Sequence, residues 1–101
     1  MLFPRKVRDK ILAGKKTQTR RIRRFRKERY ALRSIYTERA EECPWIIITR
    51  KFRQRLGDVT EEDAQKEGFA NLEEFKREWE RLNGRWNPDR VVWVYEFKLV
   101  K

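Results

Sequence analysis

The sequence contains no histidine and only one cysteine, Cys43. The missing histidine excludes a Ser-His-Asp triad, a Cys-His dyad, an imidazole proton shuttle and a histidine-ligated zinc. A single cysteine forms neither an internal disulfide nor a thiolate cluster, which is typical of a reducing cytoplasm. We interpret Cys43 as a packed small residue and expect no metal and no cofactor. Any catalysis has to use Lys, Asp, Glu, Thr, Ser or Tyr side chains.

Long apolar runs are also missing. No run approaches the ~18 residues of a transmembrane helix, and the segment Met1–Pro4 does not resemble a signal peptide. The sequence therefore predicts a cytoplasmic protein that does not associate with membranes. No repeat, linker or low-complexity tract divides the 101 residues, so we expect a single domain over residues 1–101. The pattern leaves the oligomeric state open.

Positive charge, by contrast, is abundant and localised. The chain has 27 Lys and Arg residues against 16 Asp and Glu, a formal net charge of +11. Residues 1–29 hold 13 of the basic residues and only two acidic ones, so this segment carries the whole excess. A field confined in this way favours a polyanionic partner. The alternative is the charge-rich composition of a thermostable protein, but ion-pair networks need balancing carboxylates that this segment lacks.

Apolar periodicity and end signals predict three short helices. The first spans Pro4–Ala13 and stops at the following glycine. The second begins after Thr60, whose hydroxyl caps the helix in a Thr-x-x-acid pattern, and closes at Gly68. The third runs from Asn71 to Asn83, with an apolar face formed by Phe75, Trp79 and Leu82.

Strands are predicted between and beside these helices. The expected strands are Met1–Phe3, Tyr30–Tyr36, Trp45–Thr49 and Val91–Leu99, with a turn over Glu38–Pro44. The arginine-rich stretch Lys15–Arg29 reads as an edge strand or a loop, because Ile22 and Phe25 are its only apolar anchors. Trp79 and Trp93 are assigned to the core. The expected fold class is α+β, with the strands in one sheet or small barrel and the helices packed outside it.

The stretch Gly14–Arg20, GKKTQTR, is the first candidate for chemistry. It lacks the spaced glycines of a P-loop and follows a helix rather than a strand. Lys16 and Thr19 would place an amine beside a hydroxyl, and the surrounding cations would favour a neutral Lys16. Five arginines follow closely and repel one another unless an anion binds between them: Arg20, Arg21, Arg23, Arg24 and Arg26. A phosphate backbone would relieve that repulsion, whereas the alternative is a solvated edge strand.

Four blocks of the chain resemble, in the same order, the ASCH domain family. They are Ile11–Arg20 with its GxKxxTxR core, Arg55–Phe69, Asn71–Phe75 followed by Trp79, and Val92–Phe97. The resemblance implies a PUA-like fold, a small β-barrel with flanking helices and a cleft beneath the GxKxxTxR segment. PUA-like domains are generally modules that bind RNA or read modified bases. One branch of the family consists of small acetylcytidine amidohydrolases, and other members are ribonucleases.

The resemblance also implies roles for particular residues. In the amidohydrolase branch the positions of Lys16, Thr19 and Glu67 are the general base, the nucleophile and a third group that binds substrate or shuttles a proton. Arg20 would steady an oxyanion or a phosphate. The same residues also suit a plain binding pocket, and Glu67 alone also suits a solvated acid at a helix end. The stretch Ile22–Arg29 lacks the Gly-Asp turn common in the family and is more basic, which favours RNA over a free nucleoside.

The sequence therefore predicts a module that binds RNA or a modified base through a basic cleft formed around GKKTQTR. The expected contact residues are Lys15, Arg20, Arg21, Arg23, Arg24 and Arg26. The alternative is an amidohydrolase that deacylates N4-acetylcytidine-type substrates with Lys16, Thr19 and Glu67. A nuclease is a third possibility, although no carboxylate cluster supports one. Three aromatic side chains are assigned either to base stacking or to the barrel wall: Phe25, Tyr30 and Tyr36.

Overall fold

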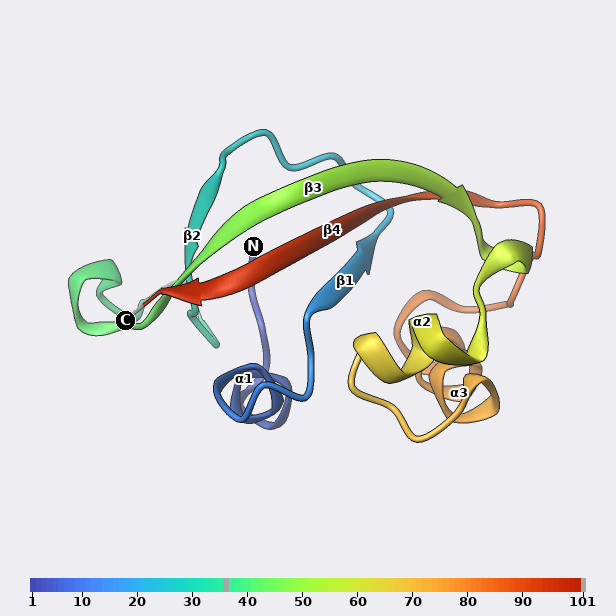
Figure 1. Ribbon diagram of the computed structural model, residues 1–101, viewed down its shortest axis with the longest axis horizontal. Helices are drawn as coiled ribbons and strands as arrows, with labels where there is room; N and C mark the ends of the chain where they lie inside the picture. The colour runs from blue at the N-terminus through green and yellow to red at the C-terminus, as the bar shows by residue number, and fades with distance from the viewer. Residues whose placement is uncertain (36, 101) are drawn as a thin grey trace.

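The structure is a computed structural model that describes residues 1–35 and 37–100. These residues form a curled antiparallel sheet and three helices. The helices are α1 (Arg5–Leu12), α2 (Glu61–Lys66) and α3 (Leu72–Asn83); the strands are β1 (Gln18–Arg21), β2 (Arg29–Ala31), β3 (Trp45–Arg55) and β4 (Val91–Val100). Two short 3-10 turns, Ala40–Glu42 and Leu56–Asp58, flank β3. The strand order is β1-β4-β3-β2, and the long strands β3 and β4 arch over the helices as a half-barrel (Figure 1). The predicted α+β class with flanking helices is confirmed.

The three predicted helices are confirmed, and their ends follow the predicted signals. Pro4 precedes the first turn of α1 rather than occupying it. At the start of α2 the Thr60 hydroxyl accepts from the Asp63 N–H, and the Asp63 carboxylate accepts from the Thr60 N–H. In α3, Phe75 and Trp79 are buried as predicted. Leu82, the third residue of the predicted apolar face, is 62% exposed. It lies in the last helical turn, past the cluster that Phe75 and Trp79 enter.

The strand β3 continues to Arg55, well beyond the predicted end at Thr49. A bulge between Ile48 and Arg50 adds one residue to β3 against β4, so the inward and outward positions exchange parity there. The sequence alternation is broken at that point although the strand is not. The prediction for Tyr30–Tyr36 was too long, because β2 ends at Ala31 and Tyr36 lies outside the described residues.

The N-terminal segment predicted as a strand contributes only an isolated parallel bridge, between Leu2 and Arg33. The Phe3 N–H also donates to the Arg33 carbonyl at 2.9 Å. These contacts hold the segment against the end of β2 without extending it into a strand. The strand expected over Met1–Phe3 is therefore corrected to a single bridge.

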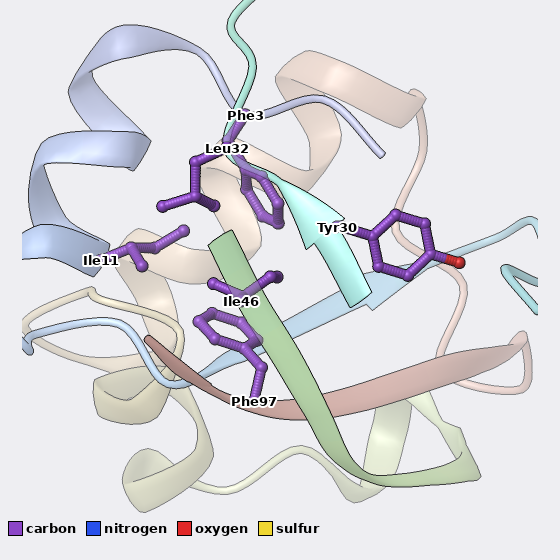
Figure 2. Packing of buried hydrophobic residues seen from close by; sticks show 6 residues of the cluster. All are labelled: Phe3, Ile11, Tyr30, Leu32, Ile46 and Phe97. Atoms are coloured by element: carbon purple, nitrogen blue, oxygen red, sulfur yellow. The ribbon is translucent and has the colours of Figure 1, made fainter. Parts of the chain in front are cut away.

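Two apolar clusters lie on opposite faces of the sheet. The first joins α1, β2, β3 and β4 through Phe3, Ile11, Tyr30, Leu32, Ile46 and Phe97 (Figure 2). The second joins α2, α3 and the other end of β4 through Leu56, Val59, Ala64, Phe75, Trp79 and Val92. Phe97 and Val92 are an odd number of residues apart in β4, so their side chains point to opposite faces. Helix α1 thus packs with the first cluster, and α2 and α3 pack with the second.

Trp93 is half-exposed, which corrects its assignment to the core. The guanidinium of Arg24 lies 5.0 Å from the centroid of its ring, and that of Arg53 lies 5.6 Å away. Cation–π contacts with the two arginines take the place of apolar packing around this ring. Trp79 is 5% exposed, as predicted for a core residue.

Neither a membrane span nor a metal cluster is found among the described residues. None of their helices combines the length and the apolarity needed to cross a bilayer. The same residues include no group of three or more His, Cys, Asp or Glu side chains placed to hold a metal ion. Cys43 is half-buried with a free thiol, and desolvation, reinforced by Glu38, raises the pKa of that thiol. A raised pKa keeps the thiol protonated and poorly nucleophilic.

Candidate functional site

Two cations of the GKKTQTR motif converge on one carboxylate. Lys16 Nζ donates to Glu67 Oε1 at 2.7 Å and to the Glu67 carbonyl at 3.0 Å. Arg20 Nη1 donates to Glu67 Oε2 at 2.9 Å. None of the three residues is more than 6% exposed. The structure therefore brings together three of the residues that the sequence singled out, in a buried cluster between β1 and the end of α2.

Polar side chains that the sequence did not single out complete this cluster. Arg20 Nη1 also donates to Gln18 Oε1, and Arg20 Nε donates to Gln54 Oε1, both at 3.0 Å. Arg20 Nη2 lies 3.5 Å from Asp63 Oδ1. The place of Gln18 beside Arg20 could have been predicted from the sequence, since alternate residues of a strand share a face. Gln54 was not, because only the register of β3 on β4 brings it near Arg20.

The protonation of the cluster follows from burial and charge. Burial lowers the pKa of the Lys16 ammonium, and the Glu67 carboxylate opposes part of that change. Burial alone would raise the pKa of Asp63, but hydrogen bonds from Thr60 and the charge of Arg20 outweigh it and lower that pKa. Two cations thus face two carboxylates, and the cluster is close to neutral as a whole. Little of its charge is available to an outside anion.

Thr19 lies on the opposite face of β1. Successive side chains of a strand alternate, so Thr19 points away from the face on which Arg20 meets Glu67. Thr19 Oγ1 accepts from Arg21 Nε at 3.1 Å, and no hydrogen bond joins it to Lys16 or Glu67 within the described part of the chain. The predicted set of lysine, threonine and glutamate is therefore split, with the lysine and the glutamate in contact and the threonine elsewhere.

Arg21 stands on the same face as Thr19 and holds the N-terminal segment. Its Nη2 donates to the Leu2 carbonyl at 2.8 Å, and its guanidinium lies 4.8 Å from the ring centroid of Phe3. Arg21 is half-buried through these contacts. Of the six predicted RNA contacts, Arg20 and Arg21 are thus engaged inside the molecule, whereas the other four are exposed: Lys15, Arg23, Arg24 and Arg26.

The stretch between β1 and β2, residues 22–28, is here called the basic loop. The Phe25 N–H donates to Tyr95 Oη at 2.6 Å, and the Lys27 N–H donates to Tyr30 Oη at 2.9 Å. The ring of Phe25 packs edge-on against both tyrosines, with centroids 6.0 and 6.2 Å apart. Phe25 and Tyr30 therefore form the wall beneath the loop. These contacts fix the loop backbone against the mutual repulsion of its arginines.

A hollow of about 450 Å³ opens beside the basic loop and is here called the arginine hollow. Three aromatic residues line it, Phe25, Tyr30 and Trp45. Its lining also includes cations from the loop, from β2 and from the segment after β2: Arg23, Arg24, Arg26, Lys27, Arg29 and Arg33. Ten ion pairs occur among the described residues, and none of them uses any of these six cations. Six cations without an ion-pair partner among the described residues thus surround one hollow, which suits a polyanion.

The curled antiparallel half-barrel with its three helices defines a PUA-like α+β fold, and the site combines a buried ionic cluster with an open basic hollow. The chain belongs to the ASCH domain family, whose profile matches residues 2–101. The predicted family is thereby confirmed. No curated protein matches the sequence.

Two solved structures share the fold. The ASCH domain from Lactobacillus crispatus is 18% identical, with a TM-score of 0.66 over 92% of this chain and 69% of that one. A protein from Enterococcus faecalis is 19% identical, with a TM-score of 0.62 over 91% of this chain and 65% of that one. At these identities the likeness establishes the fold, and each relative extends beyond the part that this chain covers.

Proposed function

We propose that this chain binds single-stranded RNA and that the arginine hollow with the basic loop contacts the RNA backbone. The observation that carries the proposal is the contrast between two sets of cations. Lys16 and Arg20 are neutralised by Glu67 and Asp63 inside the molecule. Six cations around one hollow, by contrast, have no carboxylate partner among the described residues. Phosphates would supply the missing countercharge. The PUA-like fold is often linked to RNA binding, which favours RNA among polyanions.

The proposed contact surface differs from a cleft around GKKTQTR. It keeps Arg23, Arg24 and Arg26 from the predicted set and leaves Arg20 to the buried cluster. It adds three cations that were not predicted as contacts: Lys27, Arg29 and Arg33. The basic loop is already held in place by the hydroxyls of two tyrosines. A preorganised loop loses little conformational entropy when RNA binds, so more of the electrostatic attraction is retained as affinity.

The first test measures the salt dependence of RNA binding. The affinity of the whole chain for a fluorescent oligouridylate octamer is titrated by anisotropy at several salt concentrations between about 50 and 200 mM. Each phosphate contact on a single strand contributes about −0.7 to the log–log slope, so three or four contacts give a slope of roughly −2 to −3. Affinity weaker than micromolar and insensitive to salt would contradict the proposal.

A pair of triple variants locates the surface. We expect the triple variant Arg23→Ser, Arg24→Ser and Arg26→Ser to bind RNA more weakly. The slope of log affinity against log salt concentration should move toward zero by about 2, the change expected when three phosphate contacts are lost. The matched control is Arg77→Ser, Arg85→Ser and Arg90→Ser, which removes the same charge from exposed positions away from the hollow. Equal losses in both triples would show attraction to net charge alone.

Deacylation of an N4-acetylcytidine-type substrate is the second candidate, favoured by the 2.7 Å contact between Lys16 and Glu67. Lowering of the Lys16 pKa by burial suits a general base. The mechanism also requires the Thr19 hydroxyl beside that amine, and Thr19 instead accepts from Arg21. The candidate is tested by incubating the protein with N4-acetylcytidine and assaying cytidine and acetate. Activity that survives Lys16→Ala would reject the lysine base.

A further inference from the structure

Trp45 stands apart from the other tryptophans of the chain. Trp79 and Trp86 pack edge-on against each other with centroids 6.4 Å apart, and Trp93 lies under two guanidinium groups. Trp45 has no aromatic or cationic partner in the described residues, and it lines the arginine hollow. A large aromatic ring that contacts no other ring and no cation, at the wall of a basic hollow, suggests a ligand with its own flat ring.

The position of Trp45 is rigid. It is the first residue of β3 and pairs with Ala31 of β2 on one side and Val100 of β4 on the other. The preceding residue, Pro44, accepts the Leu32 N–H at 2.8 Å, which anchors the entry to the strand. Ala31, the β2 partner of Trp45, also lines the hollow. A ring held on a strand loses little freedom when a second ring stacks on it.

The other aromatic residues of the hollow are engaged. Tyr30 is 8% exposed and accepts the Lys27 N–H through its hydroxyl. Phe25 packs against two tyrosines, and the guanidinium of Arg23 lies 4.9 Å from its ring centroid. Within the described residues that line the hollow, Trp45 is therefore the aromatic side chain that remains for stacking.

We infer that the arginine hollow holds one nucleotide of the bound RNA, with its base stacked on Trp45 and its phosphates among the surrounding arginines; the inference rests on the proposed function. The volume of about 450 Å³ lies at the small end of ligand pockets, which suits a single nucleotide unit. The indole binds the base and the cations bind the flanking phosphates. Because every base has a π-face, this subsite selects for the presence of a base rather than for its identity.

The test compares RNA with its own backbone. The oligouridylate octamer and an octamer of the same sugar–phosphate chain without bases are titrated against the wild type, Trp45→Ala, Trp45→Leu and Trp45→Phe. We expect the wild type to bind the base-containing octamer more tightly, and the Ala and Leu variants to lose about five- to 150-fold of that preference. Their salt slopes stay at the wild-type value, since no phosphate contact is removed. Trp45→Phe keeps most of the preference because it retains a ring.

The outcomes separate the inference from the proposed function. Salt-dependent binding with no preference for bases, or with a preference that Trp45→Leu retains, overturns the stacked subsite and leaves the RNA-binding proposal intact. Absence of salt-dependent binding to either octamer overturns both. Trp45→Leu keeps an apolar side chain of substantial volume, so it serves where Trp45→Ala fails to fold, and thermal melts of every variant verify the folded state.

Discussion

Buried charge is the most informative feature at the scale of single residues. Lys16, Arg20 and Glu67 were selected from the sequence for chemistry, and the structure gives each a defined electrostatic partner. Glu67 is the common partner of the two cations, so the three residues are not equivalent. Removing the carboxylate leaves two buried cations with only Asp63 nearby, whereas removing the lysine leaves Arg20 and Glu67 still paired.

We predict that Glu67→Gln destabilises the protein by about 3 to 5 kcal/mol, the usual cost of breaking a buried ion pair from one side. Lys16→Met should cost clearly less, because Arg20 continues to neutralise Glu67. Urea unfolding at pH 7 measures both. An equal or larger loss for Lys16→Met would contradict the central place of Glu67.

The pH dependence of Glu67→Gln provides a second readout of the same prediction. The pKa of Lys16 is already lowered by burial, and loss of the opposing carboxylate lowers it further. The unfolded lysine then holds a proton that the folded one has released, so stability rises with pH up to the ordinary lysine value of 10.5. We therefore expect part of the lost stability to return between pH 7 and pH 10.

At the scale of elements, the end of α2 is joined to α1 and to the segment before β1. Lys10 Nζ donates to the Gly68 carbonyl at 2.8 Å, and the Thr17 N–H donates to the Lys66 carbonyl at 2.8 Å. Gly68 has a φ of 96°, a left-handed conformation that lets the chain turn directly after Glu67. This glycine therefore sets where Glu67 lies relative to Lys16.

Gly68→Ala is predicted to destabilise more than Gly14→Ala. Both glycines have positive φ, and both substitutions carry a left-handed strain of about 1 to 2 kcal/mol. A Cβ at position 68 would also lie 3.1 Å from Lys10 Cδ and 3.3 Å from Lys16 Cβ, whereas one at position 14 meets nothing within 4 Å. Urea unfolding of the two variants measures the difference. Equal losses of unfolding free energy would show that the two lysine side chains move aside at no cost.

At the scale of the whole molecule, the charge of +11 is divided between neutralised and exposed groups. The cations around the arginine hollow are uncompensated by ion pairs among the described residues, so they repel one another in the folded state. Such repulsion is screened by salt, with a Debye length of about 10 Å at 0.1 M and 3 Å at 1 M. A surface arranged for a polyanion thus lowers the stability of the free protein.

We predict that the melting temperature rises with added NaCl and that the triple Arg23→Ser, Arg24→Ser and Arg26→Ser melts above the wild type at low salt. The difference should shrink toward about 1 M salt, where screening removes the repulsion. Arg77→Ser, Arg85→Ser and Arg90→Ser together should raise the melting temperature less, since their positions are dispersed. A stabilisation by the first triple that is unchanged by salt would point to local packing rather than charge.

The sequence by itself determined the fold class, the three helices, the confinement of charge to one third of the chain, and the choice of Lys16 and Glu67 as candidates. Helix caps and terminating glycines are local signals, so helix ends can be predicted from the sequence without a tertiary structure. The full length of β3 could not be predicted in this way. The bulge at Thr49 breaks the alternation of apolar and polar residues, whereas pairing with β4 continues the strand to Arg55.

Only the tertiary structure decided which cations are free. Arg20 and Arg23 belong to the same arginine-rich run, yet one meets Glu67 across an interface with α2 and the other lines an open hollow. The alternation of β1 places the Thr19 side chain on the face opposite Arg20, away from the cluster of Lys16 and Glu67. Trp93 lies against the guanidinium of the exposed Arg24 rather than in the core. Such outcomes depend on contacts between residues far apart in the chain. These contacts decide which charged side chains are neutralised inside the molecule and which stay available to bind a partner.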